Sequence, residues 1–291
     1  MRISTLLWGA ALVAGYAAQV ASAAELQAPT LKAWNTYLDE VNIRLEQRAA
    51  RTKHFLWSDE SEDRSARVRR GEVVVAPLLA HGAEDVPNGL IHHWIGAVFL
   101  PGATIESLWA VLHDYDNYKN TYRPAVTASK TLACSESGQQ FQMIWKRKVL
   151  FVNAAIEGRY QSHDVILDAR RGYSVADSTE IRQIAEYGRT DERMLPPDTG
   201  SGFIWRIRSI TRYEERDGGV LVEIEAIALT RDIPASLSWL VSPVVNHLSI
   251  NSLSTTLRET RQAVIEERGS GALAACPNRP RTAALGKAGA E

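Results

Sequence analysis

The sequence predicts an α+β domain in which helices pack on one face of a curved antiparallel sheet. Between residues 71 and 231, stretches of alternating apolar and polar side chains are separated by turn signals such as Asp217-Gly218-Gly219, which is the pattern of successive antiparallel strands. From Ala235 to about Glu267 the apolar spacing becomes helical. Because no βαβ unit separates the strands, the pattern favours α+β over a parallel sheet.

The first predicted element is a helix from Thr30 to about Arg51. Thr30 follows Pro29 and is a suitable N-cap. Apolar residues then recur at steps of three and four, namely Leu31, Trp34, Leu38, Val41 and Leu45. The segment from Ser58 to Arg70 is dense in charge, which predicts a solvated surface. We expect the helix that begins at Thr30 to lie on the outside of the main domain.

Two strands and a second helix follow. Residues 72–76 and 90–100 have strand composition and flank a Pro87-Asn88-Gly89 turn. Thr104 caps the helix, which runs into a polar aromatic corner ending at Pro124. Five more strand segments are predicted: Gln140–Lys148, Ile156–Ser162, Gly172–Ala185 (one long strand or a pair), Phe203–Tyr213 and Val220–Leu229.

Alternation assigns side chains to faces of these strands. Adjacent residues such as His92 and His93 point to opposite faces, so they cannot easily chelate one metal ion. Arg206, Arg208 and Arg212 share one face of their strand, opposite Trp205, Ile207 and Tyr213; in the next strand Glu223 and Glu225 lie opposite Val222, Ile224, Ala226 and Ala228. We expect the arginine face to meet the glutamate face across the two strands.

The terminal helix contains Pro243, which is expected to break or bend it, with Ser242 capping the second part. From Gly269 onward the chain is rich in Ala, Gly, Pro and basic residues, which predicts a disordered tail.

The N-terminal residues have the pattern of a secretory signal peptide. Arg2 is followed by an uncharged stretch, residues 3–24, that contains Ala21-Ser22-Ala23 near its end, and we expect cleavage after Ala23 and a periplasmic or secreted protein. A retained membrane anchor is the alternative, because 22 uncharged residues could span a bilayer. The expected organisation is residues 1–23 signal peptide, 24–70 helical extension, 71–267 main domain and 268–291 disordered tail.

The cysteine count and the net charge limit which kinds of function the sequence favours. An exported protein is in an oxidising compartment, where Cys134 and Cys276 could pair; the sequence leaves this open. With 33 Lys+Arg, 34 Asp+Glu and a net charge of -1 among 291 residues, nothing favours nucleic-acid binding. Metal-ligand spacing, nucleophile elbow, phosphate loop and dinucleotide fingerprint are not found, so we predict no metal, no cofactor and no catalytic residues.

The order of elements and two motifs resemble a known superfamily. The motifs are Leu108-Trp109-Ala110-Val111-Leu112-His113-Asp114-Tyr115-Asp116-Asn117-Tyr118 and Arg231-Asp232-Ile233-Pro234, the latter followed by the long helix with Leu253-Ser254-Thr255-Thr256-Leu257-Arg258. They resemble the START-like superfamily of polyketide cyclases, pollen-allergen-type proteins and lipid-transfer domains, over roughly residues 71–267. The resemblance implies a helix-grip fold, in which the terminal helix crosses the concave sheet and closes a hydrophobic cavity. The N-terminal helix is an addition.

A cavity of this kind predicts the residues that line it. The candidates are Met143, Trp145, Arg147, Trp205, Ile207, Ile224, Leu240, Val244, His247, Leu248 and Asn251. Large aromatic residues could instead fill the core, His247 and Asn251 could face a second helix or water, and Arg147 could be a rim residue paired with a carboxylate.

The sequence therefore favours a protein that binds or carries a lipid or other apolar small molecule, with peripheral contact to the envelope membrane as a further option. Two alternatives remain. One is a cyclase- or hydrolase-like enzyme that uses pocket His, Asp or Tyr groups. The other is an envelope structural or interaction protein with a vestigial pocket.

Overall fold

The computed structural model describes residues 24–51, 54–135, 138–149, 152–201, 203–232 and 235–267. The expected signal peptide and the expected disordered tail lie outside the described residues. Among the described helices, none has the length and apolar character needed to cross a bilayer.

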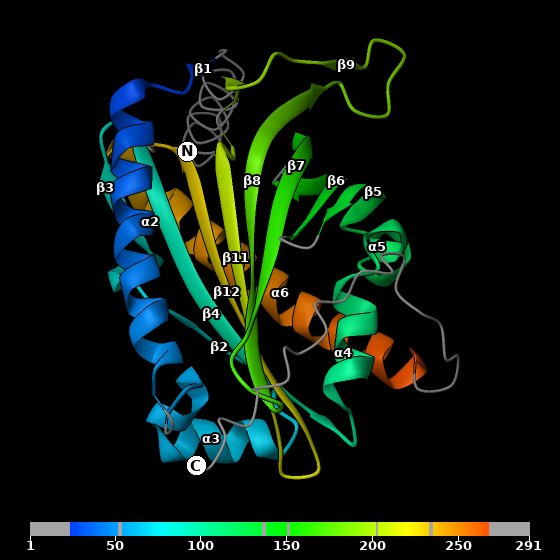
Figure 1. Ribbon diagram of the computed structural model, residues 1–291. Helices are drawn as coiled ribbons and strands as arrows, with labels where there is room; N and C mark the ends of the chain where they lie inside the picture. Colours follow the sequence, from blue (N-terminus) through cyan, green and yellow to red (C-terminus); the bar gives the residue numbers. More distant parts are fainter. Residues whose placement is uncertain are drawn as a thin grey trace, which may run out of the picture.

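An antiparallel sheet forms the body of the molecule (Figure 1). Its main path runs β2-β4-β12-β11-β8-β7-β6-β5, with β3 paired to β4 and β9 paired to β8, while β1 and β10 form a separate pair. The strands are β1 Ala24–Glu25, β2 Val74–Pro77, β3 Ala83–Val86, β4 Gly89–Pro101, β5 Val126–Ser135, β6 Gly138–Val149, β7 Val152–Ile166, β8 Arg171–Ala185, β9 Arg193–Met194, β10 Thr199–Gly200, β11 Arg206–Arg216 and β12 Gly219–Arg231.

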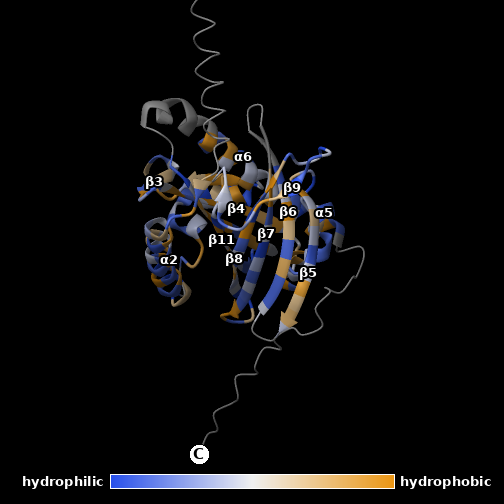
Figure 2. Cartoon of the chain, turned by 90° about the horizontal axis from the view of Figure 1, so that it is seen from above, coloured by the Kyte–Doolittle hydropathy of each residue, from blue (hydrophilic) through white to orange (hydrophobic). Residues whose placement is uncertain are grey.

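Helices lie on both sides of this sheet. The α-helices are α2 Ala28–Ala49, α3 Glu62–Arg69, α4 Ile105–Leu112, α5 Tyr118–Thr121 and α6 Ala235–Glu267; the short 3-10 turns are η1 Trp57–Glu60, η2 Ala80–Gly82 and η3 Tyr115–Asn117. The long helix α6 crosses one face, and α2 packs on the other, as Figures 1 and 2 show. This is the helix-grip arrangement with an added N-terminal helix, so the predicted fold class is confirmed.

The two faces have separate cores, which follow from the alternation along each strand. Beneath α6 and α4, the buried side chains include Trp94, Val98, Trp109, Val222, Leu253 and Leu257. Beneath α2 they include Trp34, Val41, Ile91, Ile210, Ile227 and Leu229. We call the α6 side the concave face and the α2 side the outer face. Gly96 allows α6 to touch the sheet, because a Cβ there would lie 2.6 Å from Leu257 Cδ1.

Several local expectations differ from the structure. The helix α6 runs through Pro243 without a break. The N-cap of α2 is Gln27 and not Thr30. The Thr30 hydroxyl donates instead to the Pro87 carbonyl, 2.6 Å away. The segment 58–70 is not fully solvated, since Ser58 and Val68 are buried against the outer face.

Cys134 lies near the end of β5, as its sequence context suggested, and is disulfide-bonded. The only other cysteine in the sequence is Cys276, which lies outside the described residues.

Candidate site on the concave face

The centre of the concave face consists of small side chains. Three rows of residues cross the strands in register, and we call them the concave rows: Gly96–Ile224–Thr211–Ser174–Asp164, Trp94–Ala226–Ser209–Ala176–Ser162, and His92–Ala228–Ile207. Ile224 on β12 and Ile207 on β11 are the large members of these rows; the other positions on β12, β11 and β8 are held by Ala226, Ala228, Ser209, Thr211, Ala176 and Ser174. Such side chains reach only a short way from the sheet toward α6.

Exposure differs sharply between the two faces of the same strands. On β11, Ser209 and Thr211 are half-buried, whereas their outward neighbours Ile210 and Arg212 are 0% and 2% exposed. The same alternation holds on β12, where Ala226 is half-buried and outward residues are buried. The outer face is therefore sealed by α2 and by the segment that follows it, while the middle of the concave face stays partly accessible.

One edge of the concave rows carries two buried ring nitrogens. His92 and Trp94 on β4 are 7% and 5% exposed, and His92 Nδ1 and Trp94 Nε1 have no hydrogen-bond partner in the described structure. His92 Nε2 lies 3.1 Å from Thr230 Oγ1. Burial lowers the pKa of His92 to about 4, so this imidazole is neutral near pH 7.

The other edge is aromatic. Phe141 lies between Tyr115, at 3.8 Å between ring centroids, and Tyr160, at 5.0 Å, in a stacked cluster that also buries Met143. Burial raises the pKa of Tyr160 far above its ordinary value, so these phenols are neutral. Asp164, which ends one concave row, lies 3.0 Å from His113 Nε2. The Oδ2 atom of this carboxylate thus has a protein partner, whereas its Oδ1 atom is buried and has no hydrogen-bond partner in the described structure.

The predicted lining residues divide into four groups. Met143, Trp145 and Ile207 pack together at the aromatic edge, and Ile224 lies in the core beneath α6, so these four share the concave face. Leu248 on α6 is half-buried. For Arg147, Leu240 and Val244 the structure describes only the backbone, in β6 and α6.

Three predicted lining residues lie elsewhere. Trp205 is buried in the outer-face cluster with α2, because it precedes β11 and the strand alternation does not extend to it. His247 and Asn251 are exposed on α6, and their side-chain nitrogens lie 2.8 Å apart. These three are not brought together with Met143, Trp145 and Ile224.

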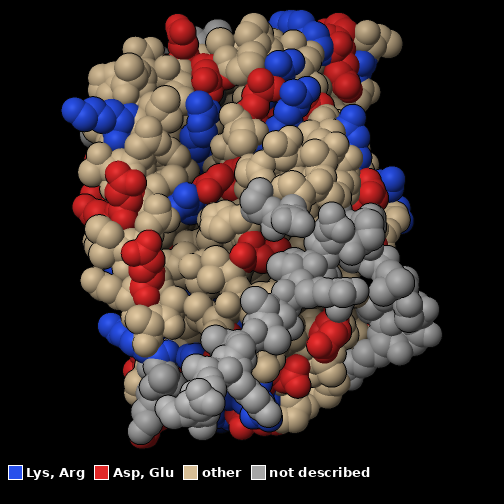
Figure 3. Space-filling view, viewed as in Figure 1, with Lys and Arg blue, Asp and Glu red and all other residues tan. Residues whose placement is uncertain are grey.

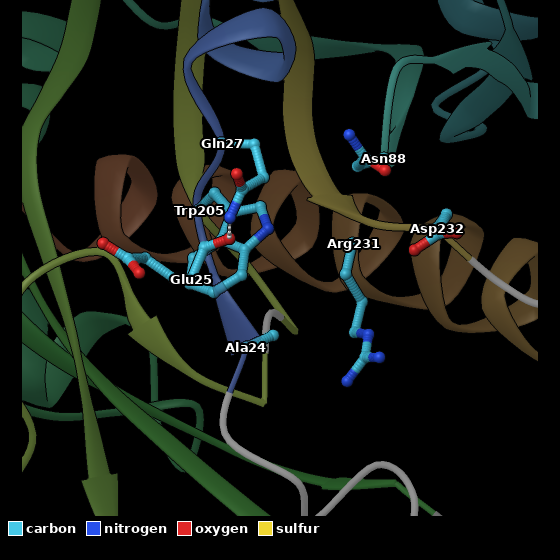
Figure 4. A pocket seen from close by; sticks show the side chains of 7 residues that line it. All are labelled: Ala24, Glu25, Gln27, Asn88, Trp205, Arg231 and Asp232. Carbon is cyan, nitrogen blue, oxygen red and sulfur yellow. Dashed lines mark hydrogen bonds between the residues drawn. The ribbon is translucent and has the colours of Figure 1, made fainter.

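Trp205 instead contributes to a hollow of about 280 Å³ at one end of the molecule (Figure 4). The other lining residues are Ala24, Glu25, Gln27, Asn88, Arg231 and Asp232. Glu25, Gln27, Asn88 and Asp232 are exposed, so the hollow has an open polar rim. It offers little apolar surface to a ligand.

The outer face holds a buried polar network that sequence reasoning found only in part. The expected pairing of arginine and glutamate is confirmed for Arg212, which donates to Glu225 across 2.6 Å and to Glu223 across 3.3 Å. Arg206 and Arg208 pair instead with Asp198 and Asp177. His93 Nε2 lies 2.7 Å from Glu225, and Tyr37 Oη of α2 lies 2.6 Å from His93 Nδ1. His92 and His93 therefore do face opposite sides of the sheet.

The N-terminal extension completes this network from the other side. The backbone N–H groups of Trp57 and Ser58 donate to the two carboxylate oxygens of Glu223, at 2.8 and 2.7 Å. Burial opposes ionisation of Glu225, but the Arg212 guanidinium and the His93 hydrogen bond outweigh it and lower the pKa of Glu225 to about 2. The sequence did not reveal this contact, because the many charged residues in the segment 58–70 predicted a solvated surface.

Other features of the described residues carry no site. They hold no group of three or more His, Cys, Asp or Glu side chains placed to bind a metal ion. On the face seen in Figure 3, basic and acidic side chains are interspersed over the described area, without an extended region of one sign.

Comparison with known proteins gives loose structural matches. No family model matches the sequence, and no curated protein matches it. A STAR-related lipid transfer protein from Xanthomonas axonopodis is 16% identical, with a TM-score of 0.41, over 66% of this chain and 98% of that one. A Streptomyces aromatase/cyclase is 13% identical, with a TM-score of 0.42, over 62% and 98%. Human STARD10 is 10% identical, with a TM-score of 0.39, over 75% and 84%. The fold assignment therefore rests on the strand order and helix placement described above.

Proposed function

We propose that this protein binds a hydrophobic small molecule or lipid between the concave rows and α6. The observation that carries the proposal is the row Ala226–Ser209–Ala176, which lies in the middle of the sheet and stays half-buried. A bent sheet and one helix enclose a solid core only if large side chains meet between them. Here the side chains of Ala226, Ser209 and Ala176 are among the smallest available, which supports an internal space for an apolar ligand.

The edges of this region support the same proposal. Ile224 and Trp94 at one side and Met143, Phe141 and Ile207 at the other would offer apolar walls. Burying a ligand's apolar surface there contributes roughly 25 cal/mol per Å² before the costs of association. The small residues would leave the volume, and the aromatic edge would bound it.

We further propose that the protein is exported and loses residues 1–23. The charge pattern of the N-terminus supports this, and a disulfide at Cys134 is typical of an oxidising compartment. Intact-mass measurement of protein from the envelope fraction tests it. The expected mass lacks residues 1–23 and falls by two hydrogens relative to the reduced chain, and a full-length cytoplasmic product would contradict the proposal.

The binding proposal is tested by loading the delipidated protein. The purified protein is stripped of lipid, offered a total lipid extract, repurified and analysed by mass spectrometry. We expect a near-stoichiometric apolar species with the wild type and a strong loss with Ala226→Phe, which would fill the centre of the rows. Ala66→Phe, at an exposed position on α3, is the matched control and should load normally. Absence of any bound species, or equal loading of Ala226→Phe, would overturn the proposal.

A further inference from the structure

We propose that the ligand carries an uncharged oxygen function, a hydroxyl or a carbonyl, which binds to the hydroxyl groups of Ser174, Ser209 and Thr211. This inference rests on the proposed function and names the chemical class of its ligand.

The three hydroxyls form a compact group. Thr211 on β11 lies directly opposite Ser174 on β8, and Ser209 is two residues along the same face. Directly opposed side chains have Cβ atoms about 4.5–5.5 Å apart, so a single oxygen atom can reach two of them. All three side chains are half-buried, and the described structure shows no hydrogen bond from their hydroxyls.

Two buried groups at the edge of the same rows also favour a ligand with a polar oxygen. His92 Nδ1 and Trp94 Nε1 lack partners although their side chains are more than nine-tenths buried. Trp94 shares a row with Ser209, and His92 shares the next row with Ile207. A buried polar atom without a partner costs about 1–3 kcal/mol, so a ligand oxygen that supplied one would gain affinity.

The charged groups on the described concave rows argue against an ionised head group at this position. On the concave rows the charged side chain is Asp164; its Oδ2 atom contacts His113, and its buried Oδ1 atom has no partner, so it could accept a hydrogen bond from a ligand hydroxyl but would repel an anion. The remaining polar groups are hydroxyls, an indole and a neutral imidazole. An ionised group placed among them would lose its hydration without gaining an opposite charge. A hydroxyl or carbonyl loses far less on burial, and these donors and acceptors can satisfy it.

Three probes with the same alkyl chain test the inference: tritiated hexadecanol, hexadecane and, at pH 8, ionised hexadecanoate. Their binding to delipidated wild type is compared with the double variant Ser209→Ala/Thr211→Val. We expect hexadecanol to bind more tightly than hexadecanoate. We also expect the double variant to lose about fivefold in hexadecanol affinity per hydrogen bond removed, with hexadecane affinity unchanged. Thr190→Val, on an exposed loop, is the control and should match the wild type.

The outcomes separate the two proposals. If none of the three probes binds the wild type, the proposed function fails. If hexadecane binds but the double variant binds hexadecanol as the wild type does, or if hexadecanoate binds best, then only the inference about the polar group is overturned.

Discussion

Arg212 on β11 donates a hydrogen bond to Glu225 on β12 across 2.6 Å, and both side chains are buried beneath the N-terminal extension. The same guanidinium contacts Glu223, which also accepts from two backbone N–H groups of the extension. The extension thus covers the charges that hold β11 and β12 together, and its removal would leave them without part of their partners.

Replacing Arg212 should therefore be costly. Arg212→Met leaves two buried carboxylates without their cation, and we expect it to lower the free energy of unfolding by about 3–5 kcal/mol. Urea denaturation measures the change. Arg44→Met removes an exposed i,i+4 ion pair with Glu40 and should cost less than about 1 kcal/mol. Similar losses for both variants would contradict the role given to the buried network.

The lowered pKa of Glu225 predicts that the folded protein loses stability in acid. The pKa of Glu225 is lowered from 4.5 to about 2 in the folded state, so as the pH falls the unfolded chain takes up the proton first. The contribution of Glu225 is complete above pH 4.5 and is lost between about pH 4.5 and pH 2. Urea midpoints measured across this range should fall more steeply for the wild type than for Glu225→Gln. Parallel pH profiles would show that the carboxylate is not held ionised by Arg212.

The lowered pKa of His92 predicts a second loss of stability, which begins at a higher pH than that of Glu225. Burial lowers the pKa of His92 from 6.5 to about 4, so below pH 6.5 the unfolded chain binds a proton that the folded protein excludes. Stability present above pH 6.5 is therefore lost as the pH falls toward 4. The difference in unfolding free energy between wild type and His92→Gln should shift against the wild type over that interval, by roughly 3 kcal/mol at most. A constant difference would mean that His92 is hydrated.

Trp34 tests whether the extension is integral to the fold. It is 4% exposed in the core between α2 and the sheet, and Trp34→Ala should cost about 3–5 kcal/mol. Ile43 on the same helix is 55% exposed, and Ile43→Ala should have little effect. A single denaturation transition for the Trp34 variant would confirm one cooperative unit, whereas a separate early transition would show that α2 unfolds alone.

The fold was predictable because its signals are local. Strand alternation placed Met143, Trp145 and Ile224 on one face and paired the Arg212 face with the Glu223 face. The alternation failed at Trp205, where the strand has not yet begun. The sequence pattern also could not show that part of the charged segment 58–70 packs on the sheet. Tertiary packing decides which face of such a short segment is buried.

The candidate site was predictable only at its edges. Reasoning from sequence favoured large apolar residues and the polar pair His247 and Asn251, yet the centre of the concave face consists of Ala226, Ser209 and Ala176. Such residues carry no distinctive pattern along the chain. They become informative only when the register aligns them across three strands.

The most direct test of the account is a crystal structure of the delipidated protein soaked with hexadecanol. We predict density for the alkyl chain between α6 and Ala226, Ser209 and Ala176, with the ligand hydroxyl within hydrogen-bond distance of Thr211 or Ser174. The account is contradicted if α6 side chains fill this space and the density is absent, or if the ligand occupies the hollow beside Trp205 instead.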